Sequence, residues 1–216
     1  LDYADAGGPV DRDVFAVGVV AHACLEDLAG AARAKGRRLS DTEAATRARE
    51  TVTRLLSVGR EHGGKVEPPP PPDAAFEGEM LALDWHAEHP CEPDTFAELR
   101  GAFARDWTPV PWDDARARFR LILDYAYAVD ERDEEGGGGR VLVIRDYKSA
   151  WNAGTADLDS LQMRAQAVAG VLIVAAHHHD FGEGWDFAGL RLEIGNLRTR
   201  SLKSRVLWPW ISADDM

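Results

Sequence analysis

The sequence has little cysteine and no long uninterrupted hydrophobic run. Its 216 residues include two cysteines, Cys24 and Cys91, which is too few for a disulfide framework or a four-cysteine metal site. The longest apolar run, 167–176, includes a glycine and is half the length of a membrane-spanning helix, which needs about 20 residues. These shortages exclude a disulfide-stapled extracellular module. They favour a cytoplasmic protein in a reducing compartment, without a membrane partner.

The sequence also lacks an excess of positive charge. Lys and Arg number 25 against 37 Asp and Glu, a net charge of −12, which excludes a small domain that is basic over its whole surface. Basic residues are nevertheless concentrated in two stretches. Residues 33–60 hold eight basic and three acidic side chains, and residues 188–206 hold five and one. The second stretch includes a predicted strand, so we expect it to border a site.

The length of 216 residues fits one elaborated domain. The chain begins at Leu1 with no start methionine and no basic leader, so we expect it to be a fragment of a longer chain. We divide this single domain, 1–216, into a helical part over about 1–106 and a sheet core over about 107–216.

The first part of the sequence has helix signals. Ser40 and Glu43 form a capping box, and Gly63 with Gly64 would stop the helix that follows. Five consecutive prolines from Pro68 then predict a stiff extended spacer. The apolar spacing and caps predict four helices, over 14–34, 41–61, 74–88 and 93–106.

The pattern changes after Trp107. Aromatic and aliphatic runs predict two strands, 119–129 and 140–147, joined as a hairpin by the polar, glycine-rich segment 130–139. A helix over 157–176, a third strand over 188–197 and a short fourth strand over 206–210 follow. The sequence therefore predicts an α/β fold of the mixed α+β kind, with a central mixed sheet flanked by helices.

Charged side chains interrupt two of these apolar strands. Asp124 lies within Leu-Ile-Leu-Asp-Tyr, and Asp146 and Lys148 end the next strand. Asp146 and Lys148 share a face because side chains alternate along a strand, and the hairpin can bring Asp124 beside them. Two carboxylates buried together are costly unless a cation neutralises them, and such oxygen ligands suit Mg²⁺ or Mn²⁺. Each residue alone also fits a bulge or an exposed ion pair.

Two further polar positions accompany this set. His22 and Glu26 are four residues apart on the first predicted helix, which places them on one face. Gln162 lies early in the helix that follows the strand with Asp146. Each alone is equally consistent with a structural histidine, a helix-surface pair or a solvent-exposed amide.

In this order the motifs resemble those of the PD-(D/E)XK nuclease superfamily, most closely the RecB-like exonuclease branch. The likeness covers about residues 18–197. It rests on an ordered set of residues: Gly18, His22, Leu25, Glu26, Asp124, Asp146-Tyr147-Lys148-Ser149 and Gln162.

The resemblance implies a restriction-endonuclease-like core and a role for each residue. His22, Asp124, Asp146 and the Tyr147 carbonyl would ligate a catalytic Mg²⁺ or Mn²⁺. Lys148 would orient or activate the attacking water, which makes Asp124, Asp146 and Lys148 the catalytic residues. Gln162 would contact the substrate near the metal and the DNA. Glu26 would support the metal ligands without binding the metal itself.

The resemblance implies a hydrolase acting on ester bonds: a metal-dependent deoxyribonuclease, by analogy an exonuclease, in DNA repair, recombination or related processing. Its partners would be DNA and helicase or other domains of the same or another chain. Three positions depart from the branch pattern, Leu121, Tyr125 and Gln166. Some members hold an iron–sulfur cluster on four cysteines, and none is expected with two.

Two alternatives stay open at this point. The chain could be a catalytically inactive DNA-binding or scaffold module that keeps the nuclease fold inside a helicase–nuclease complex. It could also be a metal-binding α/β domain that acts on another phosphorylated substrate.

Overall fold

The computed structural model describes residues 12–62, 65–132, 138–149, 161–176 and 187–207. These residues form a mixed α/β structure, as the sequence predicts. Its helices are α1 (Arg12–Lys35), α2 (Asp41–Val58), α3 (Pro72–Glu88) and α5 (Leu161–Ala176). Its strands are β1 (Arg60–His62), β2 (Lys65–Glu67), β3 (Phe96–Phe103), β4 (Pro109–Val110), β5 (Phe119–Arg132), β6 (Gly138–Lys148), β7 (Phe187–Asn196) and β8 (Ser201–Leu207).

Six strands form one mixed sheet in the order β4-β3-β5-β6-β7-β8, and β1 and β2 form a separate two-stranded sheet. β5 and β6 are the antiparallel hairpin that the sequence predicts. β6 and β7 are parallel, and α5 lies between them in the chain, whereas the other neighbouring strands are antiparallel. The six-stranded sheet is therefore mixed.

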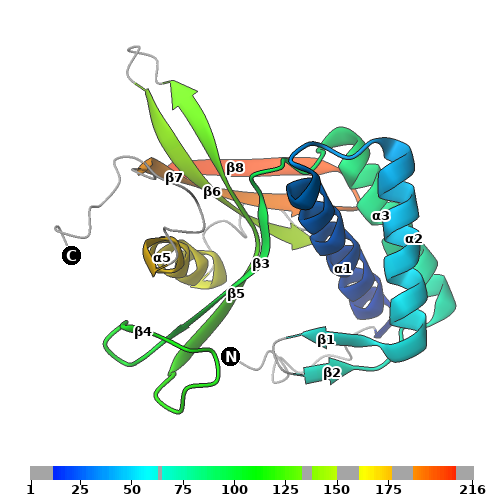
Figure 1. Cartoon of the computed structure of the whole chain (residues 1–216), viewed down its shortest axis with the longest axis horizontal. Coiled ribbons are helices and arrows are strands. Elements are labelled where there is room, and N and C mark those ends of the chain that lie inside the picture. The colour runs from blue at the N-terminus through cyan, green and yellow to red at the C-terminus, as the bar shows by residue number, and fades with distance from the viewer. Residues whose placement is uncertain (1–11, 63–64, 133–137, 150–160, 177–186, 208–216) are drawn as a thin grey trace.

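Helices lie on both faces of this sheet (Figure 1). On one face α1, α2 and α3 form a hydrophobic core with sheet residues such as Tyr125 and Tyr147. On the other face α5 contributes Met163 and Ile173 to a second core. Tyr147 belongs to the first core and Ile144 to the second, as the alternation of side chains along β6 requires. The sheet thus separates two cores that meet it from opposite sides.

The predicted helix over 93–106 is wrong, because residues 96–103 form strand β3. Phe96, Leu99 and Phe103 have helical spacing, and all three pack in the core under α5. They share a face of a strand because Glu98 has a φ of 53°, which reverses the alternation between Phe96 and Leu99. A local kink therefore gives this strand the apolar spacing of a helix. Strand β3 extends the sheet into the part of the chain that was predicted to be helical.

The second predicted helix is correct at its start and wrong at its end. Ser40 and Glu43 form the expected capping box, but α2 stops at Val58 rather than near residue 61. Gly59 ends it with a φ of 74°, and a Cβ atom there would lie 2.0 Å from the Glu67 carbonyl oxygen. The chain then enters β1, and the pairing of β1 with β2 has no counterpart in the sequence-based prediction.

The remaining predicted elements agree closely with the described residues. Helices α1 and α3 match their predicted ranges, and the last proline of the run begins α3. The fourth strand is longer than predicted, because β8 begins at Ser201. Residues 157–160 and 208–210, which were predicted to belong to a helix and a strand, lie outside the described residues.

Helix α1 is long and apolar enough over Phe15–Lys35 to cross a membrane by length and composition. It is the one such helix among the described residues, although the sequence has no uninterrupted run of that length. Half of this window is buried inside the protein, where Val20, Ala21 and Leu28 are fully enclosed. A core helix passes the same test, so the finding does not place the chain in any compartment.

Candidate functional site

The site is built around a kink that β3 and β5 share. Leu123 packs in the core under α5 and Tyr125 in the core under α1–α3, so the alternation along β5 reverses at Asp124. Glu98, which reverses β3, is the residue opposite Asp124, since Ala97 pairs with Tyr125 and Leu99 with Leu123. The regular pairing of β5 with β6 also stops at Tyr125 and Arg145. The regular pairing of β5 with both neighbouring strands is therefore interrupted at Asp124. The carboxylate of Asp124 makes other contacts there.

Asp124 uses its carboxylate to join β6 and α1. The Tyr147 backbone N–H donates to Asp124 Oδ2 at 3.0 Å, two residues after Arg145, where the pairing of β6 with β5 ends. His22 Nδ1 lies 3.6 Å from the same oxygen, and His22 Nε2 lies 3.1 Å from the Tyr147 carbonyl oxygen. The imidazole, this carboxylate and the Tyr147 peptide group are therefore in mutual contact.

Asp146 and Lys148 lie together at the end of β6. Lys148 Nζ is 2.6 Å from Asp146 Oδ2, and the Asp146 side chain is 3 % exposed whereas Lys148 is 29 % exposed. Gln166 of α5 donates from Nε2 to Asp146 Oδ1 at 3.4 Å. Continuing the β5–β6 register by one residue beyond Tyr125 and Arg145 sets Asp146 opposite Asp124. A buried carboxylate with a partly exposed ammonium thus faces the kink.

A glycine allows α1 to approach the end of β6 closely. A Cβ atom on Gly18 would lie 2.9 Å from Ser149 Oγ, closer than side chains normally pack. Gly18 and His22 are four residues apart and share a helix face. The close approach at Gly18 therefore positions His22 against Asp124 and Tyr147, which is a physical reason for the spacing seen in the sequence.

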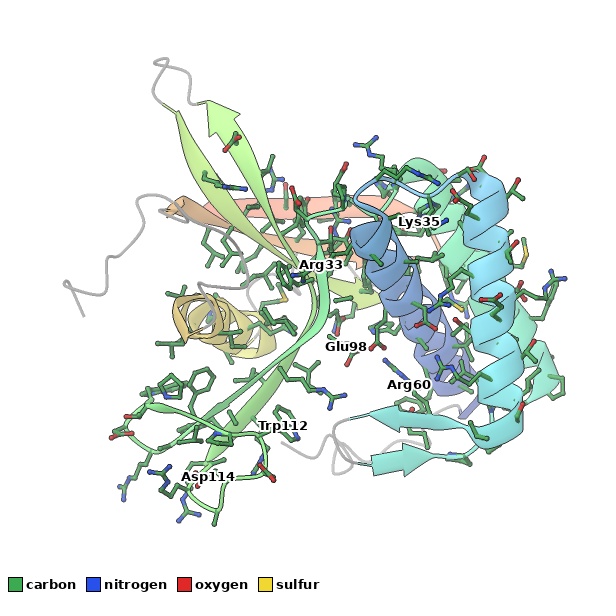
Figure 2. The ribbon with its side chains drawn as sticks, in the orientation of Figure 1. Arg33, Lys35, Arg60, Glu98, Trp112 and Asp114 are labelled. Carbon is green, nitrogen blue, oxygen red and sulfur yellow. The ribbon has the colours of Figure 1, made fainter. Side chains whose placement is uncertain are left out.

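A buried arginine supports the kink from the helical side. Arg60, whose side chain is 8 % exposed, places its Nη2 3.0 Å from Glu98 Oε1 and 3.2 Å from Glu26 Oε2. Figure 2 shows Arg60 and Glu98 in the space between β3 and α1. Glu26 thus pairs with Arg60 from the same face of α1 that carries His22. The ion pairs tie α1, β1 and β3 together beside Asp124.

Burial and neighbouring acids shift the acid–base equilibria at the site. The pKa of the Asp124 carboxyl is raised from 3.8 to about 6, mainly by burial; His22 acts to lower it and Asp146 to raise it. Burial also raises the pKa of Glu26, with Glu98 acting in the same direction and Arg60 against it. A further cation close to this carboxylate would stabilise the ionised form of Asp124.

The donor set fits a hard divalent cation. Two carboxylates, an imidazole and a main-chain carbonyl are ligand types that Mg²⁺ and Mn²⁺ accept, and the raised pKa of Asp124 indicates a need for positive charge there. No group of three His, Cys, Asp or Glu side chains already stands in a metal-holding arrangement within the described part of the chain. His22 and Asp124 meet in pairwise contact, whereas Asp146 is held by Lys148 and Gln166.

Sequence reasoning missed three residues that the structure places here. Gln166 contacts Asp146, whereas the side chain of Gln162 lies outside the described set. The spacing of four between the two glutamines places them on one helix face and was an available signal. Glu98 was hidden in a predicted helix, and Arg60 in the predicted end of α2. No protein-family model matches the chain, and no curated protein matches its sequence significantly.

Proposed function

We propose that this chain is a metal-dependent nuclease domain of the PD-(D/E)XK type, with a restriction-endonuclease-like core, that hydrolyses phosphodiester bonds of DNA. One observation carries the proposal. Asp124 and Asp146, distant in sequence and partly or fully buried, lie at the open end of the β5–β6 ladder, close enough for Asp146 to act on the pKa of Asp124. His22 contacts the first carboxylate and Lys148 the second. By the resemblance of its motifs, the activity is that of an exonuclease in cytoplasmic DNA repair or recombination.

In this proposal Asp124, Asp146, His22 and the Tyr147 carbonyl would hold Mg²⁺ or Mn²⁺. A divalent ion held there would supply a lowered pKa for water and positive charge for the phosphate. His22 and the Tyr147 peptide group fix the orientation of the Asp124 carboxylate. Buried Asp146 is oriented in the same way by Gln166. The carboxylates are therefore held by the protein before substrate arrives.

Lys148 supplies the positive charge beside the reacting phosphate. Its ammonium is close to Asp146 and is partly exposed, so it can reach both the carboxylate and an incoming phosphodiester. A fixed positive charge at the place where negative charge develops stabilises the transition state of hydrolysis. In that reaction water forms a new P–O bond, the P–O bond to the leaving sugar oxygen breaks, and the leaving oxygen takes up a proton.

The test is digestion of end-labelled single- and double-stranded DNA by the full chain, with Mg²⁺ or Mn²⁺ and with chelator. We expect metal-dependent cleavage that falls about a hundredfold or more in Asp146→Asn and in Lys148→Ala, because each change removes charge that the reaction needs. Asp84→Asn changes an exposed carboxylate on α3 and is the matched control. Cleavage that continues unchanged in Asp146→Asn overturns the proposal.

Calorimetry with Mn²⁺ separates the proposed enzyme from an inactive module with the same fold. The enzyme binds Mn²⁺, and Asp124→Asn weakens that binding strongly because a charged ligand is lost. A chain that binds DNA but neither binds Mn²⁺ nor cleaves would be the scaffold alternative.

A further inference from the structure

An exposed lobe of the sheet combines aromatic rings with arginines. We call residues 100–120 the β4 lobe: it comprises the end of β3, all of β4 and the start of β5. Figure 2 shows Trp112 and Asp114 in this lobe, which extends away from α1, α2 and α3. Nothing in the nuclease site itself accounts for this surface.

Two of its rings form a stacked, solvent-exposed pair. Trp107 and Phe119 stack with ring centroids 4.6 Å apart and planes inclined by 1°, although they are 39 % and 40 % exposed. Trp107 is held in a tight turn after β3, where its N–H donates to the Ala104 carbonyl and its φ is 64°. A tryptophan in this sparsely populated backbone region presents a large flat ring to solvent.

Most arginines around these rings form no ion pair with a residue that the structure describes. Of the lobe's exposed arginines, Arg116 pairs with Asp114. The others form no ion pair with any residue that the structure describes: Arg100, Arg105, Arg118 and Arg120. Arg120 donates instead to the Trp112 carbonyl oxygen, and Arg100 lies over the Trp112 ring. The lobe therefore holds five arginines against three aspartates, a local excess of positive charge on a chain of net charge −12.

The basic stretches noted in the sequence are mostly neutralised by comparison. In the first, six arginines pair with carboxylates: Arg37, Arg38, Arg47, Arg49, Arg54 and Arg60. In the second, three do so: Arg191, Arg198 and Arg200. Residues 188–206 do reach the site, since Arg198 donates from Nε to the Ser149 carbonyl oxygen at 2.6 Å. The β4 lobe differs in that four of its arginines form no ion pair among the described residues.

The lobe and the site lie on one strand. Phe119 precedes Asp124 by five residues on β5, which is about 16 Å along an extended strand. Between them β5 pairs with β3, and its pairing with β6 begins only at Tyr125. A ligand seated on the lobe can thus run beside β5 toward the carboxylates.

We propose that the β4 lobe binds a single-stranded segment of the DNA substrate, with bases stacked on Trp107 and Phe119 and phosphates against Arg105 and Arg118. This inference rests on the proposed nuclease function for its choice of DNA. Exposed rings suit unpaired bases, because a base inside a duplex presents no free face for stacking. Arginines that form no ion pair are available for phosphate contacts on a chain whose net charge is −12.

The test is fluorescence anisotropy of labelled poly-dT with the full chain in chelator, so that binding is measured without cleavage. We expect Trp107→Leu to weaken binding about tenfold, because leucine keeps an apolar side chain and loses the stacking face. Trp107→Phe retains a ring and most of the affinity. Arg105→Ala and Arg118→Ala each reduce the slope of log affinity against log salt by about 0.7.

Two control variants accompany these changes. Lys203→Ala removes the same charge from the rival basic stretch and leaves affinity unchanged. Phe76→Ala, which removes an exposed ring on α3, also leaves affinity unchanged.

Two outcomes overturn the inference. One is equal loss of affinity in Trp107→Leu and Trp107→Phe, and the other is equal affinity for poly-dT and for a duplex of the same length. The two proposals fail separately: Asp146→Asn stops cleavage and does not weaken binding in chelator, because it removes a negative charge, whereas Trp107→Leu weakens that binding. Thermal unfolding of each variant checks that the fold is retained.

Discussion

Burial fixes the charge state of several side chains that are not among the candidate site residues. Cys24 and Cys91 are almost fully enclosed, and burial raises the pKa of these thiols to about 12 and about 11. Both therefore remain protonated at neutral pH and behave as small apolar side chains. His86 of α3 is 3 % exposed, and burial lowers its pKa, so the folded protein holds this imidazole in its neutral form.

We predict that His86 makes the protein less stable in mild acid. Below the ordinary histidine pKa of about 6.5 the unfolded chain binds a proton that the folded chain does not. The neutral, buried form of His86 therefore contributes its full stability above a pH of about 6.5. This contribution is lost as the pH falls from there through the lower pKa that His86 has in the folded protein. Urea unfolding of wild type and His86→Gln across that range measures the effect. Parallel pH profiles for the two proteins would contradict it.

Between secondary-structure elements, the contact of α1 with α3 depends on a glycine. A Cβ atom on Gly78 of α3 would lie 2.6 Å from Val20 Cβ and 2.8 Å from the Val17 carbonyl oxygen. Neither neighbour can move aside easily, since one is a branched side chain within a helix and the other is backbone. The two helices therefore pack closely because this position has no side chain.

We predict that Gly78→Ala lowers the free energy of unfolding by about 1–3 kcal/mol, the usual cost of overpacking. Gly30→Ala on α1 is the matched control, because a Cβ atom at Gly30 would meet nothing within 4 Å beyond its own helix backbone and chain neighbours. That change should stabilise the protein by about 0.5–1 kcal/mol through the higher helix propensity of alanine. Chemical denaturation measures both, and equal effects of the two substitutions would refute the packing argument.

Across the molecule as a whole, a buried arginine connects the sheet to the helical layer. Arg145 of β6 donates to Glu193 of β7 at 2.7 Å and to the Tyr127 hydroxyl at 3.0 Å. Its guanidinium also lies 5.7 Å from the centroid of the Trp85 ring of α3. Glu193, 1 % exposed, additionally pairs with Arg191. Because the charges are buried, removal of one leaves its partners uncompensated.

We predict that Glu193→Gln costs about 3–5 kcal/mol of stability, the usual effect of breaking a buried ion pair. Trp85 of α3 packs on this network, so helices and sheet should unfold together. Circular dichroism of the helices and tryptophan fluorescence should therefore report a single unfolding transition, and the midpoint should shift from that of the wild type by the same amount with both methods. The exposed pair of Arg200 and Glu88 provides the control, since Glu88→Gln should cost about 1 kcal/mol or less. Two separate transitions in Glu193→Gln would show that sheet and helices are not coupled in this way.

Local sequence patterns were sufficient to predict the elements with simple periodicity and the residue types of the candidate site. Continuous aromatic and aliphatic runs predicted β5, β6, β7 and α5, and the capping box predicted the start of α2. Asp124, Asp146 and Lys148 could be singled out because charged side chains interrupt apolar strands. His22 stood out less by itself and gained weight from its spacing to Gly18 and Glu26.

The surroundings of those residues depend on tertiary contacts that no local pattern records. At Glu98 and Asp124 the alternation of side chains between the two faces of the sheet reverses in β3 and in β5 at the same level. The resulting spacing of apolar residues in β3 resembles that of a helix. Arg60 reaches the site because the chain turns at Gly59, directly before it. That turn brings the Gly59 backbone against the backbone of Glu67, a residue eight positions further along the chain. The exposed pair of Trp107 and Phe119 likewise forms through strand pairing. Contacts between residues that are distant in sequence depend on the path of the backbone, and local periodicity does not determine that path.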